Sequence, residues 1–369
     1  MNSDTIIIGG GVIGMLTARE LALAGQRVTL FDRQDTGRES SWAGGGIVSP
    51  LYPWRYAEPV SALAGWSQRH YRALYEQLHA ATGIDPEWTP NGLLIIAPDE
   101  QRDATGWARH HAAEVQCLDR LQLARLEPAL ARPQDGAIWM PEVAQVRNPR
   151  LVKALRRDLE LRGVPIHEHE AVTAIATRHG RVQGIHTARG NYPARTVVIC
   201  AGAWSAALLD GLTPAPPITP VLGQMILFKA PPGTIRCITL ESDRYIIPRR
   251  DGRVLFGSTL EQCGFEKRTS DTAGRQLRES AIQRFPRLAD CPVEHHWAGL
   301  RPASPSGIPY IGPVPDLEGL YLNAGHFRNG VVLGPASCRL LTDLLLTREP
   351  VLDPAPYRLD APRQDPGAE

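Results

Sequence analysis

Two residues in the C-terminal half of the chain, Arg301 and Tyr245, carry side chains suited to holding a small carboxylate. Arginine offers a planar fork of N–H donors that pairs a carboxylate at two points, whereas lysine offers a point charge. Arg301 is flanked by Leu300 and Pro302, and these apolar neighbours favour an inward-facing position, which we place between two strands. Tyr245, at the expected start of a strand, would add a hydroxyl donor. The pair is chemically suited to bind the carboxylate of a small ligand such as an amino acid. A surface ion pair and a packing aromatic are the alternative interpretations.

A second chemical feature is the glycine-rich segment DTIIIGGGVIG, residues 4–14. The residue pattern predicts a strand at Thr5–Ile8, a helix over 12–24 and a second strand over 26–31 that ends at Asp32. A strand–helix–strand unit with glycines in its first turn and an acid after its second strand is typical of dinucleotide binding.

The residues of this unit have distinct expected roles. Gly9 permits a tight turn, Gly11 lets the backbone approach a pyrophosphate, and Gly14 lets the helix pack closely on the strand. The helix N-terminus supplies N–H groups and partial positive charge. Asp32 accepts ribose hydroxyls and disfavours a 2′-phosphate, which leaves NAD and FAD as candidates. A tight turn without a ligand is the alternative.

The next segment, GRESSWAGGGIVSP at residues 37–50, favours FAD over NAD. Its small and hydroxyl-bearing residues can run backbone amides and side-chain hydroxyls along a phosphate and ribityl chain. Arg38, Ser40 and Ser41 are the contacts expected from this composition. A flexible surface loop is the alternative interpretation.

Two later segments return to the same ligand. A buried strand expected over 196–200 ends in AGAWS, where Ala201 and Gly202 let the backbone approach closely. Gly330 begins a long apolar helix, whose N-terminus would stabilise negative charge on a reduced flavin.

These elements predict an α/β protein with two interleaved domains. Its Rossmann-like FAD-binding domain, of the glutathione-reductase type, has a parallel sheet, and its α+β substrate domain has a mostly antiparallel sheet. Helices are expected over 66–82 and 148–162. The FAD-binding domain is expected to comprise residues 1–85, 146–217 and 298–350. Residues 86–145 and 218–297 are expected to form the substrate domain, and 351–369 a C-terminal tail with a frayed end.

Composition narrows the classes of partner. Lys and Arg number 40 and Asp and Glu 39, so no net charge attracts nucleic acid or an anionic membrane, and a flavin-dependent tRNA-modifying role is disfavoured. The longest uncharged run, residues 211–228, contains four prolines and predicts a linker and a strand instead of a membrane helix. No secretion signal opens the chain, which predicts a cytoplasmic protein.

No metal site is expected from the sequence. The six cysteines are scattered without a C-x-x-C pair, which favours reduced thiols. The segment His167-Glu168-His169 has no visible third ligand. The pairs His110-His111 and His295-His296 are interpreted as structural or solvated.

The motifs together resemble the D-amino acid oxidase-like family of FAD-dependent oxidoreductases, over residue 4 to about 355. Within it, the chain is most similar to the members that oxidise glycine for thiamine biosynthesis. The motifs that carry the resemblance are the glycines at 9–14, Asp32, R-x-S-S at 38–41, CAGAWS at 200–205, WAGLRP at 297–302 and GHFRNG at 325–330.

The resemblance implies a noncovalent FAD, a two-domain flavoprotein fold and a cytoplasmic homotetramer. It implies oxidation of glycine, and of small amines such as sarcosine, D-alanine and D-proline, by hydride transfer to the flavin. O2 would be reduced to hydrogen peroxide, and the imine would give glyoxylate and ammonia or pass to a thiazole synthase. A D-amino acid dehydrogenase that hands electrons to a quinone is the alternative.

The resemblance also assigns residues. Tyr245, Arg301 and Arg328 fall on the positions that bind and orient the substrate for catalysis. With the carboxylate held and the amine deprotonated, positioning over the flavin needs no protein base. Further cofactor contacts fall on Val12, Ile13, Arg33, Glu39, Gly44, Gly45, Gly46, Val172, Trp204, His326, Phe327, Arg328, Asn329, Gly330, Val331 and Val332.

Overall fold

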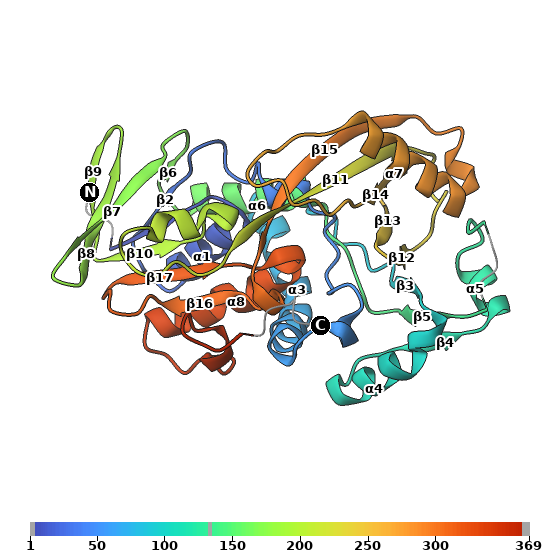
Figure 1. The fold of residues 1–369 in the computed structure, drawn as a ribbon, viewed down its shortest axis with the longest axis horizontal. Coiled ribbons are helices and arrows are strands. Elements are labelled where there is room, and N and C mark those ends of the chain that lie inside the picture. The colour runs from blue at the N-terminus through green and yellow to red at the C-terminus, as the bar shows by residue number, and fades with distance from the viewer. Residues whose placement is uncertain (1–3, 132–134, 364–369) are drawn as a thin grey trace.

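The computed structural model describes residues 4–131 and 135–363. Within these residues the chain forms a six-stranded sheet, an eight-stranded sheet and a three-stranded sheet. Figure 1 shows the six-stranded sheet and its helices on the left and the eight-stranded sheet on the right. The predicted α/β class, with a parallel sheet and a mostly antiparallel one, is therefore confirmed.

The six-stranded sheet has the order β16-β17-β10-β1-β2-β6. All its neighbours are parallel except β16 and β17. Because β1, β2, β10 and β17 share one direction, the loops that follow them meet at one edge of the sheet. The strands are β1 (Thr5–Ile8), β2 (Val28–Phe31), β6 (Ile166–His167), β10 (Thr196–Ile199), β16 (Tyr310–Pro313) and β17 (Leu320–Ala324).

Long helices cover this sheet and share one hydrophobic core with it. They are α1 (Val12–Leu23), α3 (Glu58–Thr82), α6 (Asn148–Leu161) and α8 (Gly330–Leu345). Gly14, in the first turn of α1, allows this helix to lie close to the end of β1: a Cβ there would stand 1.8 Å from the carbonyl oxygen of Gly9. The expected packing role of Gly14 is thus confirmed.

The eight-stranded sheet has the order β15-β11-β14-β13-β12-β3-β5-β4 and is antiparallel except between β12 and β3. Its strands are β3 (Leu93–Ile96), β4 (Gln116–Leu118), β5 (Ala137–Met140), β11 (Thr219–Lys229), β12 (Ile238–Glu241), β13 (Arg244–Pro248), β14 (Arg253–Gly257) and β15 (Val293–Ala303). Helix α7 (Asp271–Arg284) packs on β11 and β14, while α4 (Gln101–His111) and α5 (Arg120–Leu126) lie near the β4 edge (Figure 1).

The three-stranded sheet lies beyond β10 at the left of Figure 1. It consists of β7 (Val172–Arg178), β8 (Arg181–Thr187) and β9 (Gly190–Pro193), all antiparallel. A short helix, α2 (Ser40–Ala43), lies in the segment after β2 and contacts β15. It lies between helix α6 and strand β15.

Three sequence expectations need correction. Arg301 lies inside β15, paired with Val221 of β11, and not between two strands. The domain boundary expected at 297/298 falls within the same strand, which the mixed pattern WAGLRP concealed. Helix α3 begins at Glu58, eight residues before the expected start at Trp66, because Pro59 is accommodated in its first turn.

Within the described part of the C-terminal tail, Tyr357 and Arg363 contact the body of the protein, and Arg363 belongs to the end that was expected to fray. Tyr357 is buried and its hydroxyl donates to the carbonyl oxygen of Pro59 at 2.8 Å. The guanidinium of Arg363 lies 3.7 Å from the centre of the Tyr310 ring. The rest of the expected tail, 364–369, lies outside the described residues.

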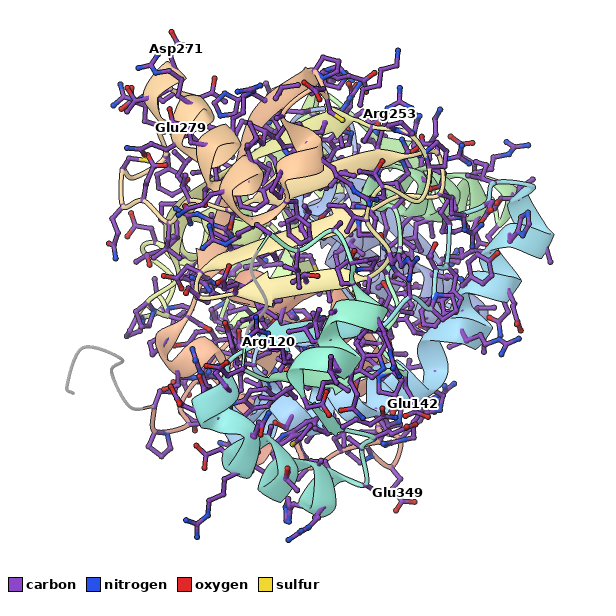
Figure 2. All side chains as sticks on the ribbon, turned by 90° about the vertical axis from the view of Figure 1, so that its right-hand side faces the viewer. Arg120, Glu142, Arg253, Asp271, Glu279 and Glu349 are labelled. Atoms are coloured by element: carbon purple, nitrogen blue, oxygen red, sulfur yellow. The ribbon has the colours of Figure 1, made fainter. Side chains whose placement is uncertain are left out.

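The surface seen in Figure 2 carries charges of both signs. Figure 2 labels Arg120, Glu142, Arg253, Asp271, Glu279 and Glu349, which are spread over this view. This mixture agrees with the formal net charge of +1. In the described part of the chain, none of the helices combines the length and the apolar character needed to cross a bilayer.

Candidate active site

A cavity of about 480 Å³ is lined by residues from both large sheets. The loops after β1, β2, β10 and β17 contribute one part of its wall, and β11, β13 and β15 contribute another. The sequence motifs that are far apart along the chain therefore meet around one space.

The glycine loop forms the first wall. Gly9 has a φ of 106°, which favours glycine, and Gly9, Gly11, Val12 and Ile13 line the cavity. The N-terminus of α1 points its first-turn N–H groups toward this wall, where they lack helical partners. One of them, on Val12, donates to the Ser41 hydroxyl at 2.8 Å. This arrangement suits a pyrophosphate.

Asp32 stands at the end of β2, beside this loop. Its carboxylate accepts N–H groups from Gly10 at 2.7 Å and from Gln34 at 2.9 Å. Burial raises the pKa of Asp32 against the opposing effect of these two N–H groups. The side chain lines the cavity, in a position to accept a ribose hydroxyl.

A cluster of charged and aromatic side chains lies next to Asp32. The Arg33 guanidinium lies 3.7 Å from the centre of the Trp204 ring, and Phe265 packs on the same ring at 5.5 Å. Glu39 accepts from Lys267 at 2.7 Å. Burial of Glu39 is outweighed by its hydrogen bonds from Lys267 and Gln34, so its pKa is lowered.

Two buried asparagines test whether a polar ligand such as FAD fits this cavity. Asn323 and Asn329 both line it. Within the described residues, the Asn323 Oδ1 and Asn329 Nδ2 atoms are buried without a hydrogen-bond partner. Gly202 also lines the wall, and a Cβ there would meet no protein atom within 4 Å. Unpaired buried polar atoms and open space beside a dinucleotide loop fit a bound FAD.

Arg301 lies at the other part of the cavity, in β15. Its Nη2 donates to the Ser258 hydroxyl at 2.6 Å and its Nη1 to the carbonyl oxygen of Thr259 at 3.3 Å. Burial lowers the pKa of Arg301, opposed by Tyr245 and aided by the charge of Arg328. Across residues 4–131 and 135–363, no carboxylate lies within ion-pair distance of this guanidinium. A buried cation held only by neutral groups is suited to an anionic ligand.

Gly223 of β11 provides the space for this guanidinium. A Cβ at Gly223 would stand 2.1 Å from both terminal nitrogens of Arg301. The residue was not selected from the sequence, although a glycine inside the apolar run VLGQMILF is the signal that could have found it.

The remaining predicted substrate residues lie nearby. Tyr245 lines the cavity from β13, with its hydroxyl 3.7 Å from the Met225 sulfur. Arg328 is exposed but also lines the cavity. His326 is buried, which lowers its pKa to about 3, and its Nε2 lies 3.0 Å from the Ser337 hydroxyl. It is therefore neutral at physiological pH.

Most predicted cofactor residues line the cavity, and three do not. Gly14 acts in packing, and Val332 is buried in the helix core. Arg38 points to solvent and pairs with Asp35 at 3.6 Å, so its expected ligand contact is corrected. Those that line the cavity are Gly9, Gly11, Val12, Ile13, Asp32, Arg33, Glu39, Ser40, Ser41, Gly44, Gly45, Gly46, Val172, Ala201, Gly202, Trp204, His326, Phe327, Arg328, Asn329, Gly330 and Val331.

Sequence reasoning also missed lining residues that carry no recognisable motif. These include Met225 of β11, Ser258 after β14 and Asn323 of β17. Ser258 lies in the segment Gly257-Ser258-Thr259 at the end of β14, and such small residues are only a weak indication of a binding site. Met225 resembles any core residue of a strand.

The fold and this site define a flavin-dependent oxidoreductase whose substrate sheet presents a buried arginine. Comparison with known proteins agrees, since the sequence profile of a family described as "FAD dependent oxidoreductase" matches residues 4–344. The chain belongs to this FAD-dependent oxidoreductase family, that of D-amino acid oxidase, and uses FAD.

Individual relatives are similar over nearly the whole chain. A "Glycine oxidase" of Pseudomonas aeruginosa is 51% identical over 97% of this chain and 98% of its own. A "Bifunctional protein ThiO/ThiG" of Synechocystis is 33% identical over 94% of this chain and 52% of its own. The crystal structure of glycine oxidase from Geobacillus kaustophilus superposes with a TM-score of 0.92, at 30% identity over 97% of this chain and 98% of the other.

Proposed function

We propose that this enzyme oxidises glycine, and more slowly other small amines, with O2 as the electron acceptor. The balanced reaction consumes glycine, O2 and water and yields glyoxylate, ammonia and hydrogen peroxide. The proposal draws on the names of the Pseudomonas and Geobacillus relatives and on the chemistry of the cavity.

The observation that carries the proposal is the unpaired guanidinium of Arg301 inside the cavity. Ser258 and Thr259 fix its orientation, and Gly223 gives it room. Bidentate pairing with a substrate carboxylate would satisfy the charge that no described residue pairs. Tyr245 would contribute its hydroxyl to the same carboxylate.

The chain's residues then act mainly by positioning. Bound FAD supplies the hydride acceptor. With the carboxylate held by Arg301 and Tyr245, the Cα–H bond of a small amino acid has few orientations left, and such positioning can supply much of a rate enhancement. His326 is neutral, so it adds no competing positive charge near the amine.

The remaining cofactor roles follow the wall described above. We propose that the Gly9–Gly11 turn and the α1 N-terminus hold the pyrophosphate, that Asp32 holds the adenosine ribose, and that Asn323 and Asn329 direct their unpaired amide atoms to the flavin end. The N-terminus of α8, at Gly330, would stabilise the reduced state.

The cellular setting is part of the same proposal. The Synechocystis relative carries a ThiO/ThiG name, which supports passage of the imine to a thiazole synthase for thiamine biosynthesis. A cytoplasmic location and a homotetramer complete it, the latter to be checked by light scattering of the holoenzyme.

The test is anaerobic reduction of the bound flavin. Glycine, sarcosine, D-alanine and D-proline are added in turn and the loss of flavin absorbance is timed, after which air or a quinone is admitted. Fastest reduction by glycine and reoxidation by air with peroxide release are expected. Reduction only by the larger D-amino acids, or reoxidation only by a quinone, would replace the proposal with the dehydrogenase alternative.

A further inference from the structure

Three side chains far from the cavity's motifs converge at the junction of α3 and α4. Of the residues that the structure describes, Glu58, His110 and His111 are the one group of three or more His, Cys, Asp or Glu side chains close enough to share an ion. We propose that they form a binding site for a divalent transition-metal ion of the zinc class, which links the start of α3 to the end of α4. The proposal is independent of the proposed function.

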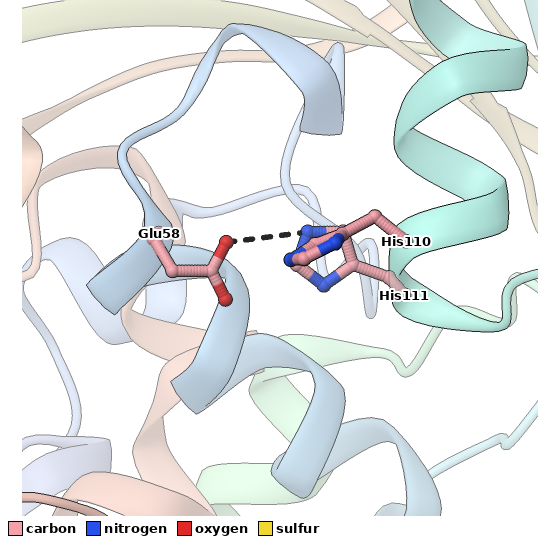
Figure 3. A group of neighbouring side chains, drawn as sticks. All are labelled: Glu58, His110 and His111. Atoms are coloured by element: carbon pink, nitrogen blue, oxygen red, sulfur yellow. Dashed lines mark ion pairs between the residues drawn. The ribbon is translucent and has the colours of Figure 1, made fainter.

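The distances between the ligand atoms support this site. One ligand atom from each residue lies within 4.8 Å of the other two. The Glu58 Oε2 and His111 Nε2 atoms are 3.4 Å apart (Figure 3). Two ligands bound to tetrahedral Zn²⁺ at about 2.0–2.1 Å stand about 3.4 Å apart. This pair already has the spacing of one tetrahedral edge, and a ring nitrogen of His110 lies within 4.8 Å of both ligand atoms.

The donor chemistry selects the class of ion. Two imidazole nitrogens and one carboxylate oxygen suit Zn²⁺, Ni²⁺ or Cu²⁺, whereas Ca²⁺ and Mg²⁺ prefer oxygen ligands throughout. Three protein ligands leave a fourth tetrahedral position for water. Glu58 and His110 are exposed, so an ion can enter directly from solvent.

Local structure explains how adjacent histidines can share an ion. His110 and His111 are the last two residues of α4, and Ala112 ends the helix with a left-handed φ of 51°. Their rings meet edge to face at 4.8 Å. The His111 ring also packs 4.9 Å from Trp107, which limits its movement. Figure 3 shows both rings turned toward Glu58.

The ordinary alternative is a simple ion pair. Glu58 lies in the first turn of α3 and His111 in the last turn of α4, where helix dipoles favour an acid and a cation respectively. This accounts for the contact between Glu58 and His111 but gives His110 no role. The proposed metal site uses all three side chains, and so it departs from the sequence expectation that the pair His110-His111 is structural or solvated.

A comparison within the chain shows that neighbouring His and Glu residues do not always converge. His167 stacks on Phe31 at 4.5 Å, Glu168 accepts from Thr36, and the His169 Nε2 lies 2.9 Å from Asp35. These three side chains have separate partners. The His-Glu-His segment that drew attention in the sequence is therefore not the site.

Zinc titration of the untagged holoenzyme, after treatment with a chelator, tests the proposal. Zn²⁺ is added in competition with a chromogenic chelator. One ion per chain is expected for the wild type, with at least about tenfold weaker binding in Glu58→Gln and in the double variant His110→Ala/His111→Ala. His70→Ala, which removes another exposed histidine of α3, is the matched control and is expected to bind as the wild type does.

Each result decides the question. Absence of a stoichiometric ion in the wild type, undiminished binding in both site variants, or equal loss in His70→Ala would overturn the site. If the double variant fails to fold, as judged by circular dichroism and flavin content, Glu58→Gln gives the answer alone, since it keeps the shape of the side chain. Flavin reduction by glycine is measured in parallel and is not expected to depend on the site.

Discussion

The two ends of the cavity are built in different ways. At the end formed by the six-stranded sheet, the first part of the wall is the glycine turn, where Gly9 and Gly11 leave backbone exposed to the cavity beside Val12 and Ile13. At the end formed by the eight-stranded sheet, a few long side chains from separate strands converge on Arg301. The glycine turn at the first end requires residues without side chains, whereas the second end requires single long side chains held in defined positions.

The largest loss of bound cofactor is expected from adding a side chain at Gly14, in the first turn of α1. In Gly14→Ala, the new Cβ would meet the backbone oxygen of Gly9 at 1.8 Å, and backbone cannot move aside cheaply. An overpacking cost of about 1–3 kcal/mol would lower the affinity for FAD by about tenfold or more. The flavin-to-protein absorbance ratio measures it. Gly106→Ala in α4 is the control, because its Cβ would meet nothing within 4 Å, and it should retain FAD.

A side chain at Gly223, in the space beside Arg301, should impair catalysis without affecting FAD binding. In Gly223→Ala, the Cβ would collide with both guanidinium nitrogens and displace them. We expect kcat/KM for glycine to fall by about 100-fold, because small misplacements are costly in catalysis, while FAD content stays normal. Steady-state peroxide release gives the rate. Equal loss of FAD would show that the two ends are not independent.

The contact between the ends offers a milder perturbation. Lys267, in the segment between β14 and α7, pairs with Glu39 of the cavity wall at 2.7 Å. Partly exposed pairs contribute about 1 kcal/mol or less, so Lys267→Ala should weaken FAD binding by about fivefold at most. Fluorescence titration of the apoprotein with FAD measures this change. High salt should lower the FAD affinity of the wild type toward that of the variant. If the variant binds FAD at low salt as tightly as the wild type, the contact between Lys267 and Glu39 does not contribute to FAD binding.

The last prediction concerns His326 and the pH dependence of stability, and it does not involve the ligand affinity of either end of the cavity. Its pKa is lowered to about 3 in the folded protein, so between about pH 3 and 6.5 the unfolded chain binds more protons than the folded one. The contribution of His326 to stability is therefore complete above about pH 6.5 and is lost as the pH falls, by up to about 1.4 kcal/mol per pH unit. Thermal melts from pH 7 to 5 should show a shallower pH dependence for His326→Asn. Parallel curves would contradict the neutral, buried state.

The contrast between the two ends also explains what the sequence could predict. The glycine turn, β1 and Asp32 interact within a short segment, and the strand Thr5–Ile8 was predicted at its observed bounds. Local pattern determines such features. The position of Arg301 inside β15 depends on pairing with β11, and the space beside it depends on Gly223, which is far away in sequence. No local pattern contains that information.

Residues that are far apart in the sequence and close together in the fold were missed for the same reason. Met225 and Ser258 reach the cavity because two strands lie side by side, and Glu58 meets His110 because two helix ends do. Arg38 is the reverse case, because its motif is local and yet its predicted contact with the cofactor was wrong. Its side chain pairs with Asp35 and faces solvent.

The central claim is that Arg301 holds the carboxylate of the substrate that reduces the flavin. Anaerobic flavin reduction is followed at rising glycine concentrations in the wild type and in Arg301→Lys. We expect the variant to keep its flavin, because the guanidinium lies at the substrate end of the cavity, and to need at least about tenfold more glycine for the same reduction rate. An unchanged glycine dependence, or loss of the flavin itself, would contradict the claim.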